Sequence, residues 1–75
     1  MTLRKIHAGV YETEDGKHRL IRTEWDGPMG GRIYLWEHAM PLGAGWEIPG
    51  DIWEWTLRDA RRGLATLIIN AAQEV

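Results

Sequence analysis

The chain has no cysteine, no serine and no phenylalanine among its 75 residues. Without cysteine, neither a disulfide nor a thiolate–zinc site can hold the fold together. Without serine and cysteine, a hydrolase that uses a Ser–His or Cys–His pair is excluded. The sequence therefore predicts a protein that is not an enzyme and that depends on aromatic packing or on another chain for its stability.

We expect neither a signal peptide nor a membrane span, because residues 1–5 lead into an alternating segment and not into an apolar run. Together with the lack of cysteine, which suits a reducing compartment, this predicts a cytoplasmic protein with no membrane partner. The length predicts a single domain, residues 1–75.

No cofactor or metal is expected. The three histidines, His7, His18 and His38, show none of the short spacings of metal ligands. The predicted strands separate His7 from His18 by about 17 Å, given the rise of a strand. We interpret all three as surface residues of strands. The glycine-rich stretch 27–31 lacks the spacing of a phosphate-binding loop and is typical of a turn.

The first half of the chain has the pattern of a β-hairpin. Residues 5–13 alternate with period two, and residues 18–25 follow after Asp15-Gly16, a strong hairpin turn signal. This register sets Val10 opposite Ile21 and, further from the turn, His7 opposite Glu24. The apolar face of this hairpin is assigned to the core, and its members are Ile6, Ala8, Val10, Ile21 and Trp25.

The second half of the chain predicts further strands and one helix. The aromatic and β-branched composition favours strands at 32–38, 46–48 and 52–55. A helix over 57–73 is indicated by Thr56 as N-cap and by a stripe from Leu57 to Ala71, with Trp55 and Ala60 spaced as a hydrophobic staple. The predicted fold class is α+β, an antiparallel sheet of three to five strands with one C-terminal helix packed across one face.

Five tryptophans are more than one small core readily hides, since every buried indole N–H needs a partner. Three of them lie within residues 46–55, and residues 37–55 carry four carboxylates but no lysine or arginine. We therefore predict a protein–protein interaction module whose partner is an unidentified protein. The alternative is that all five indoles pack inside. The candidate partner-binding residues are Trp36, Trp53, Arg58, Arg62 and Ile69.

The two arginines and the isoleucine are chosen from the helix. Arg58 and Arg62 lie near the positive end of the helix dipole, which is a mildly unfavourable place for a cation. Ile69 falls outside the apolar stripe. A homodimer is kept as an alternative, with self-association through an open sheet edge or through the Ile69 side of the helix.

The segments Thr13–Lys17, Tyr34 with Trp36, and Trp55–Arg61 resemble small uncharacterised proteins encoded by actinobacterial phages. This resemblance covers most of the chain and implies an accessory protein that binds a host or phage component. The order of elements is also similar to DNA-binding domains of the AP2 and integrase-arm type, which read DNA with a sheet backed by a helix. That second alternative assigns Tyr11, Arg22, Tyr34 and Trp36 to the reading face, and the acidic segment 37–55 disfavours it.

Overall fold

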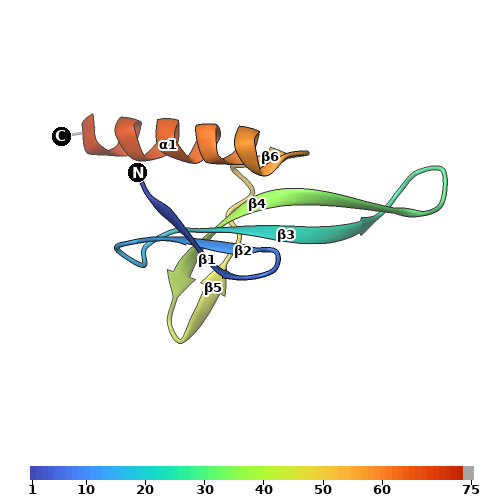
Figure 1. Ribbon diagram of the computed structural model, residues 1–75, viewed down its shortest axis with the longest axis horizontal. Coiled ribbons are helices and arrows are strands. Elements are labelled where there is room, and N and C mark those ends of the chain that lie inside the picture. The colour runs from blue at the N-terminus through green and yellow to red at the C-terminus, as the bar shows by residue number, and fades with distance from the viewer. Residues whose placement is uncertain (74–75) are drawn as a thin grey trace.

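Turn residues and alternating segments divide the chain into six strands and one helix over residues 1–73, which are the residues the computed structural model describes (Figure 1). The elements are β1 (Leu3–His7), β2 (Val10–Thr13), β3 (Arg19–Asp26), β4 (Arg32–Leu42), β5 (Gly45–Glu47), β6 (Trp53–Glu54) and α1 (Leu57–Gln73). All strand pairs are antiparallel, in the order β1-β2-β3-β4-β5, with β6 also paired to β4. The predicted α+β class, with one helix packed against the sheet, is confirmed.

The first predicted strand, 5–13, is wrong as a single strand, because the chain turns back at Ala8-Gly9. Gly9 has a φ of 82°, a conformation that L-residues with a side chain rarely adopt. β1 therefore pairs with β2, placing His7 opposite Val10, and the predicted pairing of His7 with Glu24 does not form. The register predicted for the Asp15-Gly16 hairpin is confirmed between β2 and β3, where Val10 lies opposite Ile21.

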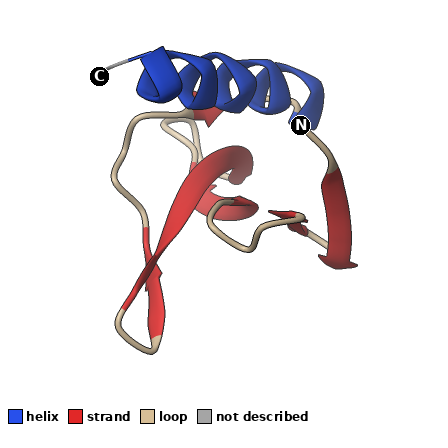
Figure 2. Cartoon of the chain, turned by 90° about the vertical axis from the view of Figure 1, so that its left-hand side faces the viewer, coloured by secondary structure: helices blue, strands red, loops and turns tan. Residues whose placement is uncertain are grey.

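Strand β4 organises the sheet, since β3, β5 and β6 all pair with it. It extends four residues past the predicted end at His38, to Leu42. β3 pairs with β4 from Arg19–Ala39 to Asp26–Arg32, and β6 pairs with it at Glu37–Trp53. The far end of β4 and all of β5 turn away from the helix (Figures 1 and 2). The sheet is thus strongly curled, and within residues 1–73 no helix covers its other face.

The main core lies between α1 and the sheet. Its buried members are Leu20, Ile52, Ala60 and Leu64, and Leu3, Trp36, Leu57, Leu67 and Ile68 pack against them. The helix therefore covers the face of β3 that carries Leu20, so the predicted core face was wrong. Of that predicted face, Ile6 and Trp25 are exposed, although Val10 is buried as predicted. Period two predicts that the two faces of a strand differ, but the side that a helix covers depends on the connection that leads to it.

The helix begins as the sequence predicts. The Thr56 hydroxyl oxygen accepts a hydrogen bond from the Asp59 N–H at 3.1 Å, which satisfies one of the free donors of the first turn. Trp55 is 68% exposed, so the predicted staple with Ala60 buries little of its indole ring. Within residues 1–73 no helix combines the length and the apolar character needed to cross a lipid bilayer.

Candidate functional site

The antiparallel register sorts the tryptophans between the two faces of the sheet. Directly paired residues share a face, and so do residues two apart in one strand. Glu37 pairs with both Ile21 and Trp53, so Trp53 lies on the face opposite Leu20. We call this helix-free side the tryptophan face, and its central members are Arg19, Ile21, Thr23, Trp25, Glu37, Trp46 and Trp53.

Two tryptophans form a stacked pair on this face. Trp25 from β3 and Trp53 from β6 have ring centroids 5.6 Å apart and planes inclined by 28°. They remain 43% and 54% exposed, respectively. Stacked indoles hold each other's orientation, so they present a broad apolar surface with few torsions left to freeze when a partner binds.

A chain of hydrogen bonds within the sheet holds the Trp25 ring of this pair in place. The Trp25 indole N–H donates to the Thr23 hydroxyl at 2.9 Å, and that hydroxyl donates to Glu37 Oε2 at 2.6 Å. Glu37 is only 3% exposed, so its carboxylate needs this donor. A buried charge thereby positions an exposed aromatic ring, which gives the surface a defined geometry.

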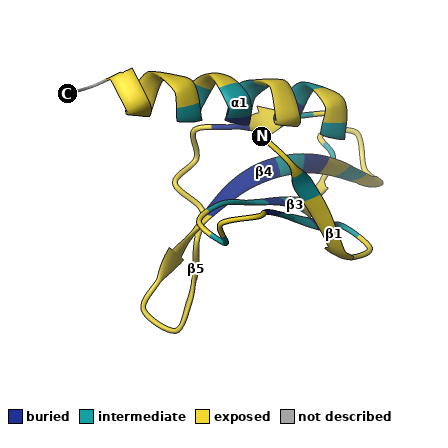
Figure 3. Ribbon diagram, turned by 60° about the vertical axis from the view of Figure 1, so that its left-hand side comes forward, coloured by how far each residue is buried: buried dark blue, intermediate teal, exposed yellow. Residues whose placement is uncertain are grey.

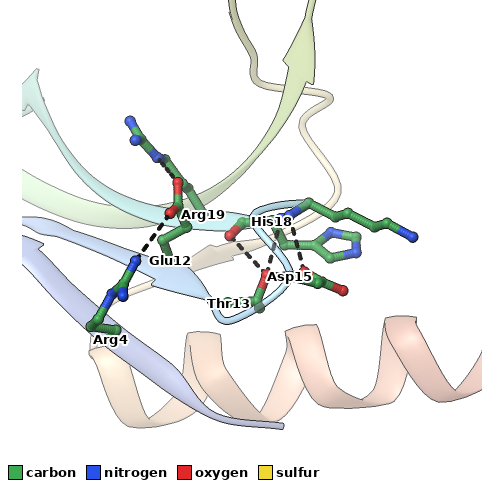
Figure 4. A network of polar contacts seen from close by, with 7 residues as sticks. Arg4, Glu12, Thr13, Asp15, His18 and Arg19 are labelled. Atoms are coloured by element: carbon green, nitrogen blue, oxygen red, sulfur yellow. Dashed lines mark hydrogen bonds and ion pairs between the residues drawn. The ribbon is translucent and has the colours of Figure 1, made fainter.

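A third tryptophan lies near the other end of the face. The Arg19 guanidinium carbon is 4.0 Å from the centroid of the Trp46 ring, within the range of a cation–π contact. Arg19 Nε also donates to Glu12 Oε1 at 2.8 Å, and Arg4 approaches Glu12 at 3.9 Å (Figure 4). The charges at this end are therefore paired within the chain, and the face is mainly apolar.

The structure places the predicted site residues in several different places. Trp53 lies on the tryptophan face, but Trp36 lies on the opposite face, packed against the core and edge-to-face with Tyr11 at 5.8 Å. Arg58 and Arg62 are exposed on α1, each beside a different groove. Ile69 is 56% exposed further along the helix, so these five residues do not form one surface.

Sequence reasoning missed Trp25 and Trp46 as members of this surface. The hairpin register already set Trp25 on the same face as Ile21, but that face was assigned to the core. For Trp46, pairing with Pro41 could not be predicted because β4 was expected to end at residue 38. Only the excess of tryptophans pointed to such a surface, and it does not say which of them share a face.

Reversal of the faces also affects the DNA-binding alternative. Its reading face was to include Tyr11 and Trp36, which lie on the face that α1 covers. The free face carries Arg19, whose charge is paired with Glu12. DNA binding stays a prediction, with only Arg22 and Tyr34 of its assigned reading face exposed.

The expectation that all three histidines are surface residues is wrong for His38, which is completely buried. Its Nδ1 lies 3.0 Å from Asp51 Oδ1, and its Nε2 lies 2.9 Å from His18 Nδ1. Alternation predicted a strand at His38, but only the packing of α1 and the 48–52 segment over β4 removes it from water. Among residues 1–73 no three His, Asp or Glu side chains are placed to hold one metal ion.

Comparison with known proteins finds no relative for this chain. No protein-family model matches it, and neither the curated proteins nor the solved structures contain a match.

Proposed function

We propose that this chain is a non-enzymatic protein–protein interaction module that docks a partner through its tryptophan face. The observation that carries the proposal is the stacked, half-exposed pair of Trp25 and Trp53 on the side of the sheet that the helix leaves open. Tryptophan is enriched among the residues that dominate binding energy, because a rigid ring buries a large area at little entropic cost.

The partner that best fits this face is a protein segment that offers arginine or lysine beside apolar residues. Residues 37–55, which include Trp46 and Trp53, contain no lysine or arginine. The chain already stacks Arg19 on Trp46 and Arg22 on Tyr34. A guanidinium from the partner can make the same contact with the exposed ring of Trp53.

The resemblance to small phage proteins supports an accessory role, with a host or phage protein in the cytoplasm as the partner. The function proposed here needs no catalytic group, metal or cofactor. It needs only a preformed surface, and the chain from Trp25 through Thr23 to Glu37 supports such a surface.

Selection from a displayed library of random peptides against the immobilised full chain tests this function. We expect the selected peptides to be enriched in arginine or lysine next to apolar residues. Trp53→Ala should weaken their binding at least tenfold, about 1.4 kcal/mol. Trp55→Ala is the matched control, because Trp55 is even more exposed but lies outside the stacked pair, and it should change binding less than threefold.

Two results would contradict the proposal. If folded Trp53→Ala binds the peptides as tightly as the original chain, the tryptophan face is not the docking surface. If the selected peptides are acidic, the proposed chemistry of the partner is wrong.

A homodimer is the second candidate, favoured by the groove beside Ile69. This groove has a volume of about 380 Å³ and is lined in part by the apolar side chains of Met1, Ile68 and Ile69. Light scattering on the original chain and on Ile69→Asp should show a twofold fall in mass if this groove joins two copies. An unchanged monomeric mass for both would remove the dimer.

A further inference from the structure

Asp51, His38 and His18 form a continuous hydrogen-bonded chain on the helix-covered face of the sheet. The Asp51 carboxylate lies 3.0 and 3.1 Å from His38 Nδ1, and His38 Nε2 lies 2.9 Å from His18 Nδ1. The two imidazole centroids are 5.1 Å apart, about the nitrogen–nitrogen distance plus one ring radius on each side, and the planes are inclined by only 28°. The rings therefore meet edge to edge, in line with a shared hydrogen bond.

The chemistry of the three groups fixes where the protons lie. An ionised carboxylate only accepts hydrogen bonds, so His38 Nδ1 carries a proton and donates it to Asp51. In neutral His38, the other nitrogen, Nε2, then has a lone pair and must accept. His18 must therefore hold its own proton on Nδ1 and donate it to His38. Both neutral rings are assigned the Nδ1–H tautomer by this argument.

One further proton is compatible with this arrangement. It binds at His18 Nε2, the nitrogen outside the chain, and leaves the bond from His18 to His38 intact. If the proton between the rings moves across to His38 Nε2, the positive charge lies beside Asp51 and the bond persists with its direction reversed. A second added proton is not compatible, because two N–H groups then point at each other across 2.9 Å.

We propose that His18 and His38 form a single shared proton site that acts as a pH-sensitive latch, holding the β2–β3 turn against β4 until both rings become protonated. The turn, residues 14–18, follows β2, and His18 is its last residue (Figure 4). Thr13, Glu14 and Asp15 form one wall of the groove beside Ile69. Release of the latch therefore loosens that wall as well as the hairpin.

The charged groups around the pair do not replace the lost bond. On the turn, Glu14, Asp15 and Lys17 flank His18, and on the segment before β6, Asp51 is already engaged with His38. Glu54 precedes the helix, whose residues 64–73 carry no charged side chain. Glu37 of β4 is on the opposite face, with Thr23.

Burial lowers the pKa of His18, and the nearby His38 lowers it further, while Asp15 and Asp51 act in the opposite direction. A folded pKa below the ordinary value means that His18 binds a proton more readily in the unfolded chain than in the folded one. The stability that this pair contributes is therefore present above about pH 6.5 and is lost as the pH falls from there towards the folded pKa.

Urea unfolding of the full chain between pH 8 and pH 5 tests the latch, with His18→Asn and His7→Asn as the variants. The folding constant of the original chain, divided by that of His18→Asn, should fall by up to tenfold for each pH unit below about 6.5. His7→Asn is the matched control, because His7 is exposed and bonds only its neighbour's carbonyl, at 3.1 Å. It should follow the original chain at every pH.

Nitrogen-15 spectra of the imidazoles in the unmodified protein give a second reading that needs no variant. At pH 8 both His18 and His38 should show the Nδ1–H tautomer. The proposal is overturned if His18 is protonated on Nε2 at that pH, or if the original chain and His18→Asn lose stability in parallel as the pH falls.

Discussion

The two faces of the sheet use the same kind of strand for different purposes. On the helix-covered face, Leu20, Leu64 and His38 are completely buried, and the polar groups of His38 find partners inside the protein. On the tryptophan face, the buried carboxylate of Glu37 is linked through the Thr23 hydroxyl to the half-exposed indole of Trp25. Figure 3 shows that part of β4 is buried, whereas β5 is exposed along its length. The first face is covered by α1, whereas the second is covered only by its own large side chains.

This difference shows how a 75-residue chain can be stable and still present a broad aromatic surface. A small domain buries a limited fraction of its surface, and here the helix takes one face only. The curl of β4 lets residues of the other face, such as Leu35 and Ala39, become buried without a second helix. The tryptophans of this face stay partly exposed, because no helix packs over them within the described residues.

The largest expected effect is on the free energy of unfolding, and it distinguishes the buried side of α1 from its exposed side. Leu64→Ala removes a completely buried side chain and should lower the free energy of unfolding by about 2 to 5 kcal/mol, as other buried leucines do. Ile69→Ala, an exposed position on α1, should change it by less than about 0.5 kcal/mol. Urea unfolding followed by circular dichroism measures both, and equal losses would mean that the helix does not pack as described.

A smaller loss is expected where the tryptophan face depends on a single hydroxyl. Thr23→Val removes the donor to the buried Glu37 carboxylate and should lower the free energy of unfolding by about 1 to 3 kcal/mol. The same change at the exposed Thr66, whose hydroxyl bonds the Arg62 carbonyl, should have an effect within about 0.5 kcal/mol. If Thr23→Val leaves the free energy of unfolding unchanged, Glu37 is solvated. The proposal that Glu37 and Thr23 hold Trp25 in place would then be wrong.

The stacked pair itself should contribute a modest coupling energy. In a double-mutant cycle of Trp25→Ala and Trp53→Ala, the coupling in the free energy of unfolding should be about 0.5 to 1.5 kcal/mol. The matched cycle with Trp55→Ala in place of Trp53→Ala should be additive within about 0.5 kcal/mol. Additive behaviour in both cycles would remove the pair as a preformed unit.

The smallest expected effect is a gain on the helix side. A Cβ added at Gly63 would lie 3.9 Å from the side chain of Ile52, an ordinary contact, so Gly63→Ala should raise the free energy of unfolding by about 0.4 to 1 kcal/mol. Gly9→Ala is the contrast, because its φ of 82° should make the same change destabilising. If Gly63→Ala destabilises the fold, the helix lies closer to the sheet than described.

Local signals located most of the elements. The cap at Thr56 and the apolar stripe placed the helix at 57–73, where the structure has it, and Asp15-Gly16 set the register of β2 and β3. The split at Gly9 escaped prediction because a glycine in an alternating run fits either a long strand or a turn. Trp25 was assigned to the wrong environment, since alternation ranks the two faces by polarity and does not say where the helix will return.

The contact between His18, His38 and Asp51 could not be predicted from the sequence either. Twenty residues separate His18 from His38, and Asp51 is thirteen further on, so no local spacing connects them. Their contact depends on the β3–β4 register, which sets Leu20 opposite His38, and on the segment that carries Asp51 over β4.

The amino-acid order alone determined the kinds of element, the helix limits, the central hairpin register and the surplus of indole rings, because each depends on neighbours within a few positions. The tertiary structure decided which side of the sheet is covered, which tryptophans are exposed and which histidine is buried. Those outcomes depend on which face of the curled sheet the single helix packs against, and that is decided by contacts between residues far apart in the sequence.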